Sequence, residues 1–160
     1  MSRLIADASA LVSLGIVTDD DPDPLALCLS RYEVVVPTAV IDELQEIASS
    51  DDVHGHAASA VLDRVDSFTT QSVDLDAEFP LDDGENATIT LANDLDAALF
   101  LCDEFNQLGL IHASLADTRL VTTPTLLSVL VRTEHLSAAD ARLLLDEISD
   151  ARSWGANSYV

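Results

Sequence analysis

Short apolar runs and apolar stripes at helical spacing alternate along the chain. The runs at residues 4–6, 32–36 and 97–102 are nearly unbroken, as expected for parallel strands that are covered on both faces. Two weaker runs predict two more strands, the first of them near an edge of the sheet. The pattern places strands at 4–6, 32–36, 68–73, 97–102 and 119–122, and helices at 9–15, 25–30, 40–47, 54–65, 83–93, 105–116, 124–130 and 138–151.

Strands that alternate with helices favour one parallel sheet with helices on both of its faces. The fold class predicted from the pattern is therefore α/β. The 160 residues contain no internal repeat and no linker long enough to divide the chain. We expect a single domain over residues 1–160.

The composition is apolar and very acidic at the same time. The chain has 29 acidic residues against 7 basic ones, a formal net charge of −22, and no lysine. Hydrophobic residues make up 48% of the chain, which supplies a core and argues against disorder. A compact core beneath so acidic a surface indicates adaptation to very high salt, where the screening length falls to about 3 Å. The charge therefore does not exclude nucleic acid as a partner.

The sequence also indicates where the protein works. It has no basic leader followed by an apolar segment, and no apolar run approaches the length of a membrane span. Cys28 and Cys102 lie in apolar surroundings without metal-ligand spacing, which is typical of buried thiols in a reducing compartment. We expect a cytoplasmic protein with no membrane segment.

Acidic residues follow two of the strands and begin two of the helices. Asp7 follows the first strand, Asp103-Glu104 follows the strand at the centre of the chain, and Glu43 and Glu85 lie near helix starts. Each has a simpler explanation, because aspartate caps helices and glutamate in a first turn suits the helix dipole. The carboxyl ends of parallel strands meet at one edge of a sheet, however, so the acids are placed to converge on one pocket.

Carboxylates held this close together repel each other, and their pKa values rise unless a cation neutralises them. Mg²⁺ and Mn²⁺ suit an all-oxygen site and promote hydrolysis of phosphodiester bonds. The chain has no Gly-rich phosphate loop, no G-x-S-x-G elbow and no Cys–His pair at a telling place. The pattern therefore favours metal-dependent hydrolysis over attack by a side-chain nucleophile.

Four segments, in the right order, resemble the motifs of PIN-domain nucleases, the fold of VapC-type ribonuclease toxins. The third and fourth are most similar to an archaeal and bacterial PIN subfamily with a GEAEAIALA-type motif. The resembling segments are residues 4–11 (LIADASAL), 36–44 (VPTAVIDEL), 84–92 (GENATITLA) and 99–104 (LFLCDE), followed by 123–127 (TPTLL), a leucine-rich helix and Trp154.

This resemblance implies a three-layer α/β/α sandwich with a central parallel sheet and a metal-dependent endoribonuclease site. Water would hydrolyse the RNA phosphodiester bond, leaving a 3′-hydroxyl and a 5′-phosphate. Ser9 would support the site from behind the metal ligands. The catalytic acids implied by the motifs are Asp7, Glu43, Glu85 and Asp103, and the same four with Glu104 would hold Mg²⁺ or Mn²⁺.

The chain departs from the subfamily pattern at three places. Asp103-Glu104 stands where the subfamily usually has two aspartates, which leaves open which of the two contacts metal. Ala87 stands where many members carry a second glutamate. The basic residues that often follow the paired acids are replaced by residues 105–107 (FNQ), of which Asn106 is expected to supply a polar contact at the site.

The likeness to VapC implies a toxin–antitoxin pair, in which a small antitoxin protein places a peptide in or over the acidic pocket, and it implies a homodimer. The missing basic residues favour a second interpretation, a catalytically weak or inactive PIN-like domain that binds protein or RNA. A phosphorylated receiver domain is disfavoured, because such a domain needs a lysine after a late strand and the chain has none.

Overall fold

The structure is a computed structural model, and it describes residues 1–74 and 83–154. Its centre is a five-stranded sheet in the order β3-β2-β1-β4-β5, and every neighbouring pair of strands is parallel. β3 lies at an edge, as predicted. The strands are β1 (Arg3–Ala6), β2 (Glu33–Pro37), β3 (Thr69–Gln71), β4 (Leu99–Leu101) and β5 (Arg119–Val121).

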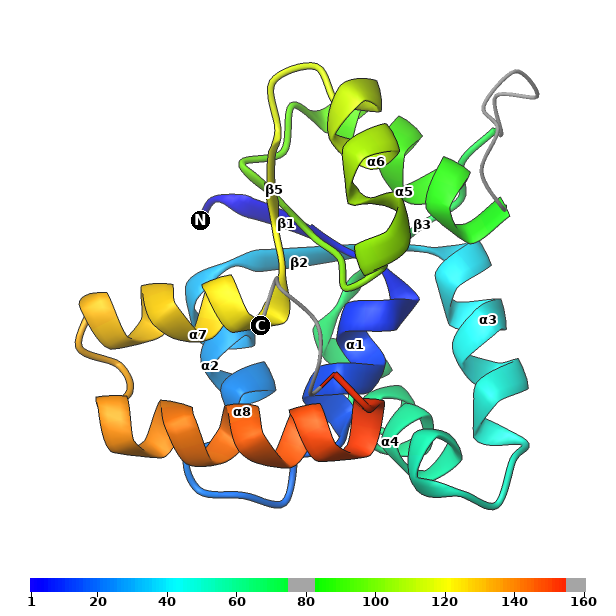
Figure 1. The fold of residues 1–160 in the computed structure, drawn as a ribbon. Helices are drawn as coiled ribbons and strands as arrows, with labels where there is room; N and C mark the ends of the chain where they lie inside the picture. Colours follow the sequence, from blue (N-terminus) through cyan, green and yellow to red (C-terminus); the bar gives the residue numbers. More distant parts are fainter. Residues whose placement is uncertain (75–82, 155–160) are drawn as a thin grey trace.

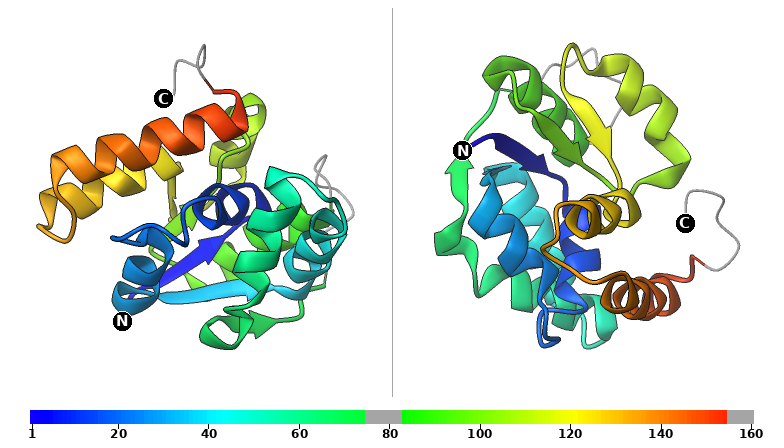
Figure 2. Two further views of the ribbon diagram at one scale, coloured as in Figure 1. Left: turned by 90° about the horizontal axis from the view of Figure 1, so that it is seen from below. Right: turned by 90° about the vertical axis from the view of Figure 1, so that its left-hand side faces the viewer.

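Helices connect the strands and lie on both sides of the sheet (Figures 1 and 2). The 3₁₀ turns η1 (Val65–Ser67) and η2 (Phe105–Gln107) complete the connections. The α-helices of the described residues are α1 (Ala8–Gly15), α2 (Pro24–Arg31), α3 (Thr38–Ala48), α4 (Val53–Leu62), α5 (Asp83–Leu95), α6 (Leu108–Ser114), α7 (Thr123–Arg132) and α8 (Ala138–Arg152).

Both faces of the sheet are buried, because consecutive strand residues point to opposite faces. On one face, Leu4 and Ala6 of β1 belong to a large apolar cluster with α1, α2, α3, α4, α7 and α8. On the other face, Ile5 packs in a smaller cluster with Ile89 of α5 and Ile111 of α6. The structure confirms the prediction of an α/β/α sandwich around a parallel sheet.

The strand order places a switch point at the centre of the sheet. The chain runs from β1 outward to β2 and β3, then returns to the other side of β1 to form β4 and β5. Ligands of open α/β sheets bind at the carboxyl ends of the strands beside such a switch. Here the amide of Asp7 donates to the Leu101 carbonyl at 2.9 Å, so the segments that leave β1 and β4 begin side by side.

Some predicted boundaries differ from the observed ones. The helix expected over 105–116 is the η2 turn followed by α6. The η2 turn packs the Phe105 ring against Trp154, with the ring centroids 4.9 Å apart, so its residues are used for a long-range contact before α6 begins. By residue type, Asp82 and Asp83 both suit the N-terminal cap of α5. Asp82 lies outside the described residues, as does the segment 155–160.

No helix in the described ranges combines the length and the apolar character needed to cross a bilayer.

The close contact between α1 and α4 depends on a glycine, Gly15, which has no side chain. A Cβ atom on Gly15 would collide with the Ala57 carbonyl oxygen and would lie 2.9 Å from Val61 Cγ2. Overpacking against backbone costs more than alanine gains in helix propensity, so we expect Gly15→Ala to lower the free energy of unfolding by about 1–2 kcal/mol. Urea unfolding in molar KCl measures it.

Gly109→Ala is the matched control for this prediction, because no atom of another described segment would lie within 4 Å of a Cβ atom on Gly109 in α6. This control should leave stability unchanged or slightly raised. Equal unfolding midpoints for the two variants would contradict the close packing of α1 on α4.

Candidate active site

Acidic side chains from four elements line a pocket of about 180 Å³ at the carboxyl edge of the sheet, which we call the acidic pocket. Asp7 follows β1, Glu43 lies in α3, Glu85 lies in the first turn of α5, and Glu104 follows β4. Residues far apart in the sequence therefore meet at this edge of the sheet. The other residues that line the acidic pocket are Ala8, Ser9, Val12, Ile47 and Arg152.

Asp7 is the most deeply buried of the acids in the pocket, with 2% of its surface exposed. Its Oδ2 accepts hydrogen bonds from the Ser9 hydroxyl at 3.0 Å and the Cys102 thiol at 3.5 Å. Its Oδ1 is buried and has no hydrogen-bond partner among residues 1–74 and 83–154. Burial raises the pKa of Asp7 to about 6, and the negative charge of Glu104 adds to the effect.

Ser9 connects the ends of β1 and β4. Its hydroxyl donates to Asp7 and also accepts a hydrogen bond from the backbone amide of Asp103 at 2.9 Å. Both bonds are buried, and Ser9 itself is 8% exposed. The hydroxyl therefore fixes the orientation of the Asp7 carboxylate relative to the chain that leaves β4.

Asp103, one of the acids implied by the motifs, is not among the residues that line the acidic pocket. Its Oδ1 accepts from the Thr123 amide at 2.7 Å, and its Oδ2 accepts from the Thr123 hydroxyl at 2.6 Å. Burial raises the pKa of Asp103, and these two hydrogen bonds oppose that rise. Asp103 ties the end of β4 to the first turn of α7, while the adjacent Glu104 lines the pocket. The metal role implied for Asp103 stays a prediction.

Asn106 is exposed in the η2 turn and is not among the residues that line the acidic pocket. The structure therefore does not bring it to the other predicted site residues.

Sequence reasoning missed Arg152, the last residue of α8. Its Nη2 donates to the Ser9 carbonyl oxygen at 3.3 Å, and its side chain lines the pocket beside the acids. Burial lowers the pKa of Arg152, and the negative charges of Asp103 and Glu104 oppose that shift. The only local signal was a basic residue in a last helical turn, which usually just complements the helix dipole.

The donor set of the pocket fits a hard divalent cation, because all its candidate ligands are carboxylate oxygens. The buried Asp7 Oδ1 has no donor of the described chain to satisfy it, so a cation would supply the missing interaction. No three Asp, Glu, His or Cys side chains in the described ranges already form a group that could hold an ion. Binding an ion would therefore require the acids to draw closer together.

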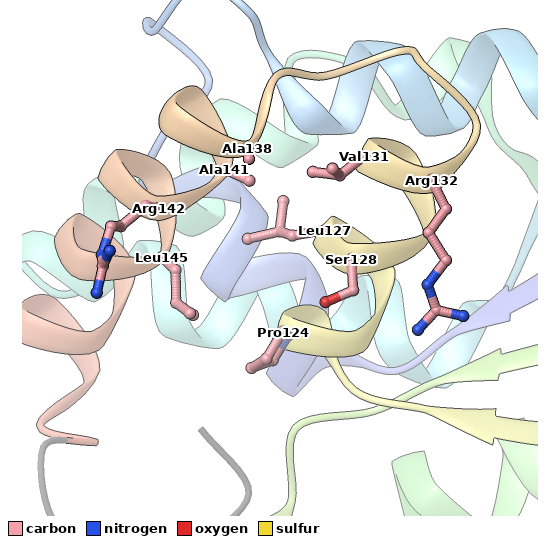
Figure 3. Close-up of a pocket in the computed structure, with 9 residues that line it drawn as sticks. All are labelled: Pro124, Leu127, Ser128, Val131, Arg132, Ala138, Ala141, Arg142 and Leu145. Atoms are coloured by element: carbon pink, nitrogen blue, oxygen red, sulfur yellow. The ribbon is translucent and has the colours of Figure 1, made fainter.

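The groove between α7 and α8 is a different kind of cavity. It measures about 460 Å³ and contains no acid. Figure 3 shows Leu127 and Leu145 facing the space between the two helices, while Arg132 and Arg142 extend along its outer sides. With an apolar floor and no carboxylate, this groove lacks the ligands that metal-dependent chemistry needs.

The model of the DUF3368 family, a PIN domain, matches residues 3–160. The match covers nearly the whole chain, so the protein belongs to the PIN-domain family. PIN domains are generally nucleases, which are hydrolases, and they generally use divalent metal ions. None of the curated proteins matches the chain.

Proposed function

We propose that the protein is a metal-dependent endoribonuclease that cleaves RNA phosphodiester bonds at the acidic pocket. The observation that carries the proposal is the buried Oδ1 of Asp7, which lacks a hydrogen-bond donor in the described chain and lies in a pocket that three glutamates also line. Membership of a nuclease family supports the same chemistry. The ion would be Mg²⁺ or Mn²⁺, as the all-oxygen donor set favours.

Asp7, Glu43, Glu85 and Glu104 would hold the ion, which when bound would lower the pKa of a water molecule and stabilise charge on the phosphate. The chain's own contribution is orientation. The hydroxyl of Ser9 holds Asp7 in place, and the bonds from Asp103 to Thr123 hold the segment that carries Glu104. These bonds restrict the motion of Asp7 and of the segment before Glu104 before RNA arrives.

We also propose the partners that the resemblance implies, a small antitoxin protein and a second copy of the chain, in the cytoplasm of a salt-adapted cell. A second acidic cavity of about 430 Å³ supports the proposal of an antitoxin partner. It adjoins the acidic pocket through Glu43 and is also lined by Asp42, Glu46 and Asp83. A basic peptide would complement this surface. The same surface also favours the alternative function, a PIN-like domain that binds such a peptide and cleaves weakly or not at all.

Incubating the protein with a set of RNAs tests the proposed function. The reactions contain Mg²⁺, Mn²⁺ or EDTA, in both dilute and molar KCl. We expect cleavage with either metal, no cleavage with EDTA, and products with 3′-hydroxyl and 5′-phosphate ends. If the folded protein cuts no RNA under any of these conditions, the proposed nuclease activity is overturned. The alternative function, a PIN-like domain that binds a partner without cleaving RNA, would then remain.

Two glutamates of α3 provide a matched pair of variants for this experiment. Glu43 lines the acidic pocket. Glu46, one helical turn later, is exposed, lines the neighbouring cavity and is not among the residues that line the acidic pocket. Glu43→Gln should reduce the cleavage rate by roughly a hundredfold or more, because it removes a charge that the metal needs. Glu46→Gln should cleave as the parent does. Equal rates for both variants would remove Glu43 from the site.

A further inference from the structure

We propose that Arg152 binds the phosphate backbone of RNA at the acidic pocket and so supplies the cation that the segment after β4 lacks. The inference rests on the proposed function and extends it to the way in which the substrate is held. It would make the C-terminal end of α8 part of the substrate-binding surface.

The first step of the argument is the position of Arg152. It is the one basic side chain among the residues that line the acidic pocket, where it stands beside Asp7, Glu43, Glu85 and Glu104. The adjoining cavity between α3 and α5 is lined by further acids and by no basic residue. RNA carries a negative charge at every phosphate and would be repelled on that side, so the side of Arg152 offers the favourable approach.

The second step is that the guanidinium keeps unused hydrogen-bonding capacity. Within residues 1–74 and 83–154, no carboxylate forms an ion pair with Arg152 within 4.0 Å. Its Nη2 donates to the Ser9 carbonyl oxygen, and an arginine has five N–H donors in a planar fork. A half-buried guanidinium with spare donors matches the geometry of a phosphate, which it binds through two parallel hydrogen bonds.

The third step is that the structure holds the end of α8 against the site. The Ala151 carbonyl oxygen lies 3.1 Å from Nε2 of His54 in α4. The Trp154 ring packs on Phe105 of the η2 turn, and the Trp154 amide donates to the Ser149 carbonyl oxygen at 2.9 Å. Contacts on both sides of Arg152 therefore fix its backbone, which lowers the entropy lost when its side chain binds a ligand.

A purely structural role is the competing explanation, in which Arg152 only offsets the charges of Asp103 and Glu104 and the dipole of α8. The two roles predict different results. A counter-charge would be replaced well by lysine and would not affect RNA affinity. A phosphate-binding fork would be replaced poorly by lysine, which has no planar pair of donors.

RNA binding distinguishes these roles without depending on cleavage. Fluorescence anisotropy with a labelled single-stranded RNA, in Ca²⁺ in place of Mg²⁺, would compare the full-length parent with Arg152→Ala, Arg152→Lys and Arg142→Ala. Arg142 is the control because it lies on the same helix but lines the α7–α8 groove. We expect Arg152→Ala to weaken RNA binding at least tenfold, Arg152→Lys to recover part of the loss, and Arg142→Ala to bind as the parent does.

Mn²⁺ titration of the same proteins by calorimetry completes the test, because loss of a positive charge should leave Mn²⁺ affinity equal or higher. The inference would be overturned if Arg152→Ala bound RNA as tightly as Arg142→Ala does. It would also be overturned if Arg152→Lys recovered the full RNA affinity of the parent, or if the parent bound no RNA. If the parent cleaves RNA with metal but Arg152→Ala binds RNA as tightly as the parent does, only the inference about Arg152 is overturned and the proposed nuclease stands. If the parent binds RNA through Arg152 but never cleaves it, only the proposed nuclease activity is overturned.

Discussion

Replacement of Asp7 by asparagine should abolish most metal-dependent cleavage of RNA. We expect the rate to fall by roughly a thousandfold, equivalent to about 4 kcal/mol of lost transition-state stabilisation. The physical reason is the burial of Asp7 and the unpartnered Oδ1, because this carboxylate gains most from a cation and an amide cannot replace its charge. Single-turnover cleavage with saturating Mn²⁺ measures the effect.

The pH dependence of stability shows whether Asp7→Asn loses cleavage because it lacks the carboxylate or because it does not fold. The folded-state pKa of Asp7 is raised to about 6, so its protonated form stabilises the metal-free protein at low pH and this contribution is lost as the pH rises through 6. Asparagine carries no charge at any pH. We therefore expect metal-free Asp7→Asn to be more stable than the parent at pH 7.5, by up to about 3 kcal/mol.

Thermal unfolding provides the control for this variant. Mn²⁺ should raise the melting temperature of the parent and leave that of Asp7→Asn nearly unchanged, because an ion stabilises only a state that binds it. A variant that is less stable than the parent at pH 7.5, or that cleaves at the parental rate, would contradict the role assigned to Asp7.

The second large effect concerns the adjacent residues Asp103 and Glu104. We expect variants of Asp103 to change the stability of the protein and variants of Glu104 to change its affinity for metal. Asp103→Ala should lower the free energy of unfolding by about 2–4 kcal/mol, since it leaves the fully buried amide and hydroxyl of Thr123 without an acceptor. Glu104→Gln should change stability little, because Glu104 is only half-buried, but should weaken Mn²⁺ binding about tenfold.

Asp103→Asn tests whether Asp103 is also a metal ligand. An asparagine can accept from the Thr123 amide and donate to the Thr123 hydroxyl, so it should restore most of the stability lost in Asp103→Ala. If the hydrogen bonds are the whole role of Asp103, this variant should bind Mn²⁺ like the parent in calorimetry. A loss as large as that of Glu104→Gln would instead make Asp103 a ligand, as the motif implies.

The fold could be predicted from the sequence because its signals are local. Residues 32–36 are apolar at nearly every position, and a strand of this composition is stable only when both faces are covered. The convergence of Asp7, Glu43, Glu85 and Glu104 on one pocket follows from the same pattern, since parallel strands end at one edge. The boundary between η2 and α6 was missed, and the contact of Phe105 in η2 with Trp154, almost fifty residues later, is one that local spacing cannot show.

The missed features of the site are determined by contacts between distant residues. Which of two adjacent acids faces the pocket depends on Thr123, whose amide and hydroxyl attract Asp103 from twenty residues away. Arg152 meets the Ser9 carbonyl oxygen across 143 residues of chain. Local spacing carries no information about such contacts, so only the packed structure identifies Arg152 as part of the site.

The placement of Arg152 at the end of α8 also determines the order in which the pocket is completed during synthesis. A ribosome makes Asp7, Glu43, Glu85 and Glu104 before it reaches α7 and α8. The growing chain therefore passes through a stage in which the acids exist without Arg152. Docking of the last helix is thus the step that turns a cluster of acids into a complete pocket.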